Sequence, residues 1–225
     1  MIFITGDTHG NIDIHKLNSN NFPEQKQMTK NDFVIITGDF GGVWNRSEEE
    51  IYWLKWLNDK SFTTLFVDGN HENFDLLNSY DVGYFYGGKV HRILANIYHL
   101  MRGQVFEING TKIFTMGGAT SIDKQYRREN ISWWKEELPS CAEYEEALSN
   151  LEKHNYIVDY VLTHTCSKQI MEHMEYLKED NSLNSFFDIL DNQLQYKHWY
   201  FGHFHQDRQI DKKHSVVYNN IVKLR

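Results

Sequence analysis

The chain has 225 residues, of which 40% are apolar, and its formal net charge is −8 at neutral pH. This length and apolar content allow a large hydrophobic core, and we expect residues 1–225 to form one domain. The acidic balance disfavours a broad electrostatic grip on long nucleic acid. No run approaches the roughly 20 apolar residues of a membrane-spanning helix, and the first residues show no charged leader, so we expect no membrane partner. Cys141 and Cys166 form no Cys-x-x-Cys pair, which favours a reducing, cytoplasmic location.

Short apolar runs, often rich in β-branched residues, predict five buried strands: residues 2–5, 33–37, 64–67, 158–163 and 199–201. Each run is followed directly by polar residues. In open α/β sheets, the loops beyond the carboxyl ends of the strands form the ligand crevice. We therefore expect the five polar clusters to converge in space, although they are far apart in the sequence.

Two helices have recognisable starts between these strands. Ser47 with Glu50, and Ser140 with Glu143, have the spacing of a capping box, in which hydroxyl and carboxylate bond each other's free backbone N–H groups. Apolar residues follow at helical spacing and predict core-facing stripes: Ile51, Leu54 and Leu57 after the first start, and Tyr144, Ala147, Leu148 and Leu151 after the second.

The middle of the chain contains a hairpin signal. Asn109-Gly110 separates two alternating segments within residues 105–116, and a type I′ turn needs positive φ at both central positions. The sheet is therefore expected to be mixed, within an α/β fold. Residues 73–95, rich in Tyr, Phe and Gly, are expected to form a long surface excursion over the site.

The polar clusters supply side chains suited to metal ions. The candidate ligands are Asp7, His9, Asp39, Asn70, His164, His203 and His205. Any one of them alone is more often a turn, capping or packing residue. Carboxylate and amide oxygens combined with several imidazoles favour a pair of ions such as Mn, Fe or Zn over one closed structural zinc. Asp39 is the candidate bridge, because a carboxylate can place one oxygen on each of two ions.

Seven of the twelve histidines lie outside the polar clusters and are interpreted as surface or packing residues: His15, His91, His99, His154, His173, His198 and His214. The chain has no Gly-x-Ser-x-Gly elbow and no His-Glu-x-x-His helix, and Cys166 is not followed by a phosphate-cradling loop. Covalent catalysis and zincin proteolysis are therefore disfavoured.

Gly-Asp-Thr-His-Gly, Gly-Asp, Gly-Asn-His-Glu, Thr-His and Gly-His-Phe-His follow one another between residues 6 and 205. In this order they resemble the calcineurin-like metallophosphoesterase superfamily. The resemblance implies a two-sheet mixed β-sandwich flanked by helices, with a dinuclear centre at the carboxyl ends of the strands. It assigns Asp7, His9, Asp39 and His205 to the first ion, and Asp39, Asn70, His164 and His203 to the second. It makes His71 the catalytic imidazole, next to Asn70.

The chemistry can also be argued from the residues. Two divalent ions, with Mn as the first expectation, can hold a shared water as hydroxide and neutralise a phosphoryl group attacked in line. His71, beside ligand Asn70, is placed to protonate the leaving oxygen. The predicted activity is hydrolysis of a phosphate monoester or diester, in a phosphorylated small molecule or a nucleotide. The alternatives are a non-catalytic binding module with the same fold and a mononuclear hydrolase of non-phosphate esters or amides.

One departure from the resemblance concerns substrate binding. In protein Ser/Thr phosphatases and their diadenosine-tetraphosphatase relatives, the second motif continues with Asp and Arg, where this chain has Gly42 and Val43. One interpretation places a replacement phosphate clamp between residues 117 and 128, with Arg127 and Arg128 as candidates and the neighbouring Trp133 and Trp134 able to stack on a base, but for any single residue the ordinary-loop alternative is favoured. The alternative is an ordinary loop in which Asp123 pairs with Arg127 and both tryptophans pack beneath.

Overall fold

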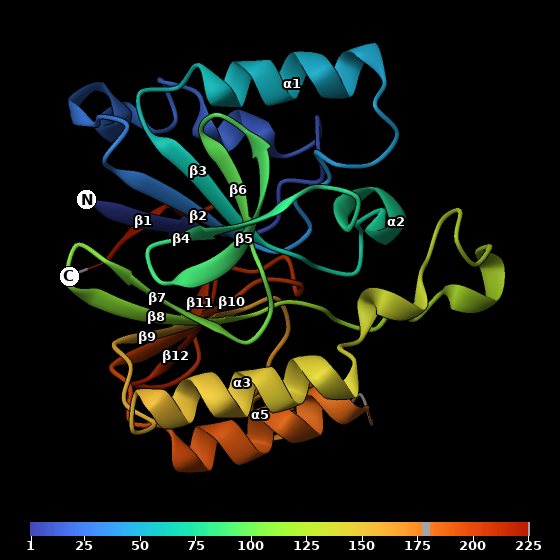
Figure 1. The fold of residues 1–225 in the computed structure, drawn as a ribbon, viewed down its shortest axis with the longest axis vertical. Helices are drawn as coiled ribbons and strands as arrows, with labels where there is room; N and C mark the ends of the chain where they lie inside the picture. The colour runs from blue at the N-terminus through green and yellow to red at the C-terminus, as the bar shows by residue number, and fades with distance from the viewer. Residues whose placement is uncertain (177–180, 225) are drawn as a thin grey trace.

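The computed structural model describes residues 1–176 and 181–224. Two β-sheets pack face to face, with helices on their outer faces (Figure 1). The first sheet has the order β13 (Val222–Lys223), β1 (Ile2–Thr5), β2 (Phe33–Thr37), β3 (Thr63–Val67), β6 (Ile97–Leu100), β5 (Gly88–Leu94) and β4 (Val82–Phe85). The second has the order β11 (Arg208–Gln209), β12 (His214–Val216), β10 (His198–Phe201), β9 (Tyr160–Thr163), β8 (Thr111–Met116) and β7 (Gln104–Ile108).

Helical segments connect and cover the sheets. The α-helices are α1 (Glu48–Asn58), α2 (Phe74–Leu77), α3 (Cys141–Lys153), α4 (Lys168–His173) and α5 (Ser182–Gln193). The 3-10 turns are η1 (Ile14–Leu17), η2 (Pro23–Gln27), η3 (Lys124–Tyr126) and η4 (Lys135–Glu137). Within residues 1–176 and 181–224, no helix has the length and apolar character to cross a membrane.

Both sheets have a parallel centre and antiparallel edges. Strands β1, β2, β3 and β6 pair in parallel in the first sheet, as do β8, β9, β10 and β12 in the second. Strands β13, β5 and β4, and β7 and β11, add antiparallel pairs. The predicted two-sheet mixed α/β sandwich is confirmed, and each predicted strand is present with its end shifted by at most two residues.

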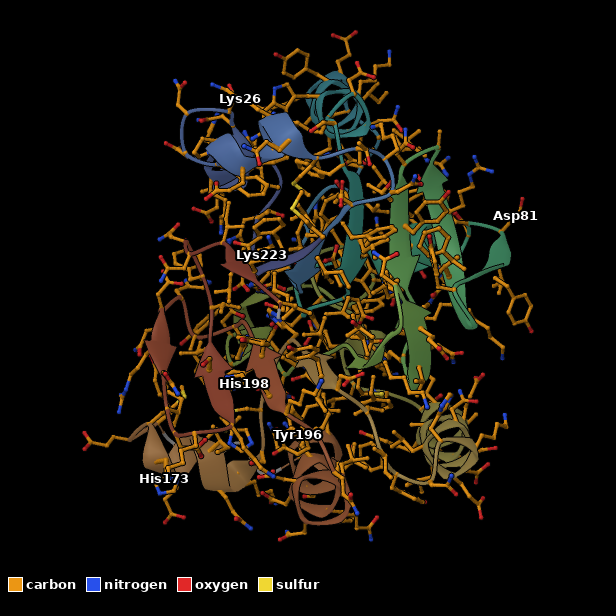
Figure 2. All side chains as sticks on the ribbon, turned by 90° about the vertical axis from the view of Figure 1, so that its left-hand side faces the viewer. Lys26, Asp81, His173, Tyr196, His198 and Lys223 are labelled. Carbon is orange, nitrogen blue, oxygen red and sulfur yellow. The ribbon has the colours of Figure 1, made fainter. Side chains whose placement is uncertain are left out.

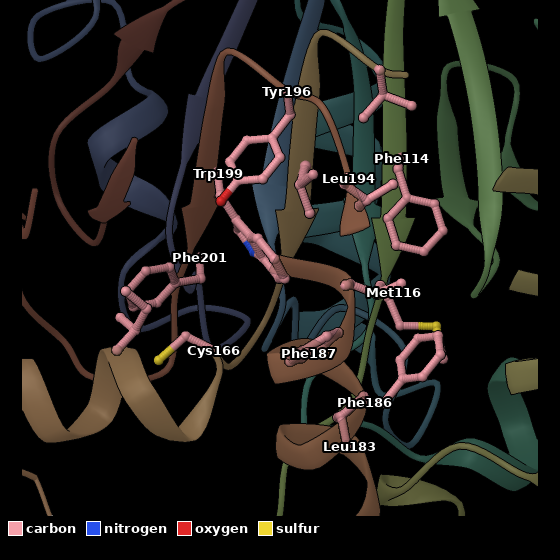
Figure 3. Close-up of a cluster of buried hydrophobic side chains, with 14 of the residues drawn as sticks. Phe114, Met116, Cys166, Leu183, Phe186, Phe187, Leu194, Tyr196, Trp199 and Phe201 are labelled. Atoms are coloured by element: carbon pink, nitrogen blue, oxygen red, sulfur yellow. The ribbon is translucent and has the colours of Figure 1, made fainter. Parts of the chain in front are cut away.

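The hydrophobic core has three layers. The central layer lies between the sheets and contains Ile4 and Ile35 from one sheet and Phe106 and Leu162 from the other. An outer layer packs α1 and η1 on the first sheet. The other outer layer packs α3, α4 and α5 on the second sheet, around large side chains such as Trp199 (Figure 3). Because the central strands are buried on both faces, they read as continuous apolar runs in the sequence.

The helix starts agree with the sequence only in part. Ser140 and Glu143 form the full capping box, but at α1 only Ser47 caps, because the Glu50 carboxylate accepts from the backbone of residues 44–46 instead. The predicted stripes were wrong at Ile51 and Leu148, which are 42% and 36% exposed. Both lie at the margin of an apolar face whose centre is already covered by the sheet.

The prediction for residues 73–95 was wrong. They form α2 and two strands at the edge of the first sheet, where β4 and β5 pair antiparallel. The alternation of Val82, Tyr84 and their neighbours is a half-exposed strand pattern rather than a loop pattern. The 105–116 hairpin is confirmed, with φ of 54° at Asn109 and 78° at Gly110.

Histidines outside the polar clusters have packing or surface roles, as predicted. His91 and His99 are buried and hydrogen-bonded to each other, and His99 reaches Asp68. His214 is buried between Tyr196 and the carboxylates of Asp191 and Asp211. Tyr196 and His198 lie in the lower half of the view in Figure 2, on the same side of the molecule as the end of α5.

Candidate metal centre

The five polar clusters meet at one edge of the sandwich. They follow β1, β2 and β3 of the first sheet and β9 and β10 of the second, each at the carboxyl end of a parallel strand. Four of the candidate side chains sit on left-handed backbone: φ is 44° at His9 and Asp39, 68° at His203 and 49° at His205. Non-glycine residues rarely adopt this conformation, although Asp and His do so more readily than most.

Two buried carboxylates form the centre of this cluster. Asp39 Oδ2 lies 3.4 Å from His9 Nε2, while its Oδ1 lies 3.3 Å from His164 Nε2. The two oxygens of Asp39 therefore face two different imidazoles. Asp7, which is fully buried, places Oδ2 3.2 Å from His205 Nε2.

Further contacts fix the orientation of the imidazoles and of the amide. His9 Nδ1 donates to Asp13 at 2.7 Å, which turns Nε2 toward Asp39. His164 Nδ1 donates to the carbonyl of Thr37 at 2.9 Å. Asn70 Nδ2 donates to Ser121 Oγ at 3.1 Å, and Asn70 Oδ1 lies 3.2 Å from His164 Nε2. Metal-binding histidines are commonly held in this way through the nitrogen that faces away from the ion.

The electrostatics of the cluster favour a cation. Burial raises the pKa of Asp39, but the charges and hydrogen bonds of His164 and His9 outweigh it and hold that pKa well below its usual range. Burial likewise lowers the pKa of His164, but Asp39 and Asp7 raise it to about 10. Two buried anions thus require nearby positive charge.

The donor atoms fit divalent ions. Asp7, His9 and His205 form one group whose ligand atoms lie within 4.8 Å of one another, and Asp7, Asp39 and His164 form a second. Asp7 Oδ2 is buried and accepts no hydrogen bond from the described residues, so it retains an unused lone pair. His203 belongs to neither group, but its ring lies 4.9 Å from that of His164, and its backbone N–H donates to Asp7.

His71 lies at the rim of this cluster. Its backbone N–H donates to Asp39 Oδ1 at 2.8 Å, and its Nδ1 lies 3.4 Å from Nη1 of Arg127. Burial lowers the pKa of His71, the charge of Asp39 opposes this, and the charge of Arg127 adds to the lowering. A neutral imidazole at this rim can accept or pass on a proton near neutral pH.

A cavity of about 810 Å³ opens next to His71. Its lining includes Asp39, Asn70, His71, His203 and His205, together with Ile122, Arg127, Tyr176 and Phe204. Its mixed polar and apolar wall can accommodate an anionic group and an organic substituent.

The two arginines of the predicted clamp are separated. Arg127 reaches the cavity while its Nε donates to Asp123 at 2.8 Å, whereas Arg128 is exposed and does not line the cavity. Trp134 is only 2% exposed and donates to Asp75, so it packs beneath the loop; this burial and the Asp123–Arg127 pair agree with the ordinary-loop alternative, and base stacking by Trp134 is excluded.

Residues outside the sequence-based set support the site. Glu72, fully buried, accepts from the backbone N–H of Phe40 at 2.7 Å and thereby fixes the loop after Asp39. Gly42 and Val43 are buried beside this loop. Asp13 lies four residues after His9, a spacing that could have suggested it. Nothing in the sequence pointed to Ser121.

The chain belongs to the calcineurin-like phosphoesterase family, whose family model matches residues 1–207. Membership in this family indicates a metal-dependent hydrolase of phosphoesters, and the clustered donors of Asp7, Asp39 and the histidines agree with it. A search among curated proteins found no match to this chain.

Proposed function

We propose that this protein hydrolyses a phosphate monoester or diester with two divalent ions, Mn being the first candidate and Fe or Zn the alternatives. The first ion would be held by Asp7, His9, Asp39 and His205. The second would be held by Asp39, Asn70, His164 and His203. The supporting observation is the position of Asp39, whose two carboxylate oxygens face His9 and His164 separately, as a bridging ligand requires.

When bound, two such ions lower the pKa of a shared water and neutralise charge on the phosphoryl group. The protein's own groups do the rest. His71, at the rim beside Asn70, would act as the general acid in its protonated form and give that proton to the oxygen of the leaving group. Arg127, which lines the same cavity beside His71, would offer N–H donors to the phosphate oxygens. Arg128, the other candidate from the sequence, does not line the cavity and is given no role in this proposal.

The substrate we propose is a phosphorylated small molecule or nucleotide. The cavity has room for an organic substituent beside the carboxylates, and Ile122, Tyr176 and Phe204 give it an apolar wall. The net charge of −8 weighs against long nucleic acid. A single domain over residues 1–225 and a cytoplasmic location stay predictions from the sequence.

The test starts from metal-free protein. Mn is added back, and rates are compared on p-nitrophenyl phosphate, its bis ester, cyclic nucleotides, a dinucleotide and a phosphopeptide. We expect Mn-dependent turnover with two ions bound per chain, and loss of both in Asp39→Asn. Absence of bound metal and of turnover would favour a non-catalytic module. One ion per chain with indifference to phosphate would favour a mononuclear esterase or amidase.

A further inference from the structure

The segment 217–220 reaches the metal centre from beyond residue 207, where the family match ends. Three consecutive backbone N–H groups, of residues 218–220, donate to the carboxylate of Asp207 at 2.8, 3.0 and 3.0 Å. The backbone N–H of Gly6 donates to the carbonyl of Tyr218, and a Cβ on Gly6 would lie 2.1 Å from the carbonyl oxygen of Val217. Only glycine permits this approach, so the segment is fixed against the loop that carries Asp7.

A buried lysine joins the same two segments. Lys16 Nζ donates to the carbonyl of Asp7 at 2.7 Å and to the carbonyl of Tyr218 at 2.6 Å. The same ammonium group lies 4.6 Å from the centre of the Tyr218 ring. The position of the Tyr218 side chain relative to Asp7 is therefore held by charge-assisted contacts on both its backbone and its ring.

The Tyr218 side chain contacts the surroundings of two candidate ligands. Its ring stacks on the imidazole of His205, with centroids 4.8 Å apart and an angle of 16° between the planes. Its hydroxyl lies close enough to Asp13, the carboxylate that accepts from His9 Nδ1, to interact with it electrostatically. One tyrosine thus connects the two histidines that surround Asp7 Oδ2.

His164 and Asn70, two of the candidate ligands of the second ion, are held by different groups. His164 is oriented by the carbonyl of Thr37, and Asn70 is oriented by Ser121. These contacts come from β2 and from the loop after β8, not from the C-terminal segment. The contacts that orient His164 and Asn70 are therefore separate from those that orient His9 and His205.

We propose that Tyr218 is a positioning residue for one ion only, the ion held by Asp7, His9, Asp39 and His205. This inference rests on the ligand sets given under Proposed function. The ring of Tyr218 fixes the plane of His205, and its hydroxyl lies beside Asp13, the carboxylate that orients His9. Groups that orient metal-binding histidines contribute strongly to metal affinity although they do not touch the ion.

The experiment measures the two ion affinities separately. Metal-free protein is titrated with Mn²⁺, and free Mn²⁺ is followed by electron paramagnetic resonance. Tyr218→Leu removes the stack and the hydroxyl, and Tyr218→Phe removes the hydroxyl alone. Tyr98→Phe is the matched control, because its hydroxyl donates to the carbonyl of Ala95 far from the site.

We expect Tyr218→Leu to weaken one of the two Mn²⁺ affinities by about 10- to 100-fold and to leave the other unchanged. Tyr218→Phe should give a smaller loss at the same site, and Tyr98→Phe none. Unchanged affinities in Tyr218→Leu would overturn the inference. Equal weakening at both sites, with a lower melting temperature, would also overturn it, since that pattern belongs to a merely structural residue.

A second readout needs no metal. In metal-free protein, ¹H–¹⁵N spectra of the imidazoles are recorded, and Tyr218→Leu should shift and broaden the signals of His9 and His205 but not of His164. Wild-type protein that binds no Mn²⁺ would refute the proposed function. In that case unchanged His9 and His205 signals in Tyr218→Leu would still refute this inference, and shifted signals would support it.

Discussion

Arg127 and Arg128 offer a matched pair of substitutions for the phosphate clamp. Both belong to the loop after β8, but only Arg127 lines the cavity and approaches His71, at 3.4 Å. Its Nε is already bonded to Asp123, which holds the guanidinium in place while other N–H groups point toward the cavity. We therefore expect Arg127→Ala to weaken binding of the phosphoryl group in the transition state, and Arg128→Ala to have no effect.

The magnitude follows from the environment of the guanidinium. A hydrogen bond to a charged group contributes about 1.5–3 kcal/mol, and each 1.4 kcal/mol corresponds to a factor of ten. The Arg127 side chain is 20% exposed, so solvent screens the contact and the lower part of that range applies. Arg127→Ala should reduce kcat/KM by roughly 10- to 30-fold.

The assay compares kcat/KM of wild type and both variants on p-nitrophenyl phosphate and on its bis ester, with bound metal measured in each sample. The loss in Arg127→Ala should be larger for the monoester, which carries one more negative oxygen for the guanidinium to neutralise. Equal rates for Arg127→Ala and wild type, or equal losses for the two variants, would show that Arg127 does not bind the phosphate.

Further predictions concern the acid, the loop glycine and the pH dependence of stability. His71→Ala should lower kcat by about 10²- to 10⁴-fold on a substrate with a poor leaving group while bound metal stays constant, and an unchanged rate on that substrate would remove His71 from the mechanism. Gly38→Ala should lower metal content, because the added Cβ would lie 2.1 Å from His164 Nδ1. Gly110→Ala is the control, since Gly110 also has a positive φ but faces open space; it should lower the free energy of unfolding by only about 1 kcal/mol through backbone strain. Although burial lowers the pKa of His214, its two carboxylate partners raise that pKa above the usual value. The contribution of His214 to the free energy of unfolding should therefore be complete below about pH 6.5 and be lost as pH rises through the folded-state pKa. Urea unfolding of His214→Asn should show a flatter pH profile between these two pKa values, and a profile parallel to wild type would refute this.

The strands and clusters were readable from the sequence because their signals are local. A strand that is buried on both faces must be apolar throughout, and a polar residue directly after it must lie where the carboxyl ends of the strands meet. This reasoning located Asp7, Asp39 and His164 without any knowledge of the strand order. It failed for residues 73–95, because edge strands such as β4 are half exposed and their pattern is weak.

The supports of the site were less accessible to sequence reasoning. Ser121 orients Asn70 from 51 residues away, and Tyr218 stacks on His205 only because β13 and β12 bring the C-terminal segment past β1. Trp134 looked like a stacking residue, but its neighbour Trp44 and its acceptor Asp75 hold it in the interior. Such contacts depend on chain pairing, which residue spacing does not encode.

The amino-acid sequence by itself determined a mixed α/β sheet, the edge where polar groups gather and the ligand chemistry, since these follow from hydrophobic burial and from the donor types present; the two-sheet sandwich came from the family resemblance of the motifs. Only the tertiary structure decided which carboxylate oxygen faces which imidazole, that Arg127 and not Arg128 enters the cavity, and that Tyr218 supports His205. The physical reason is range: burial patterns act along a few residues of one strand or helix, whereas the orientation of a side chain is fixed by groups that folding brings from distant parts of the chain.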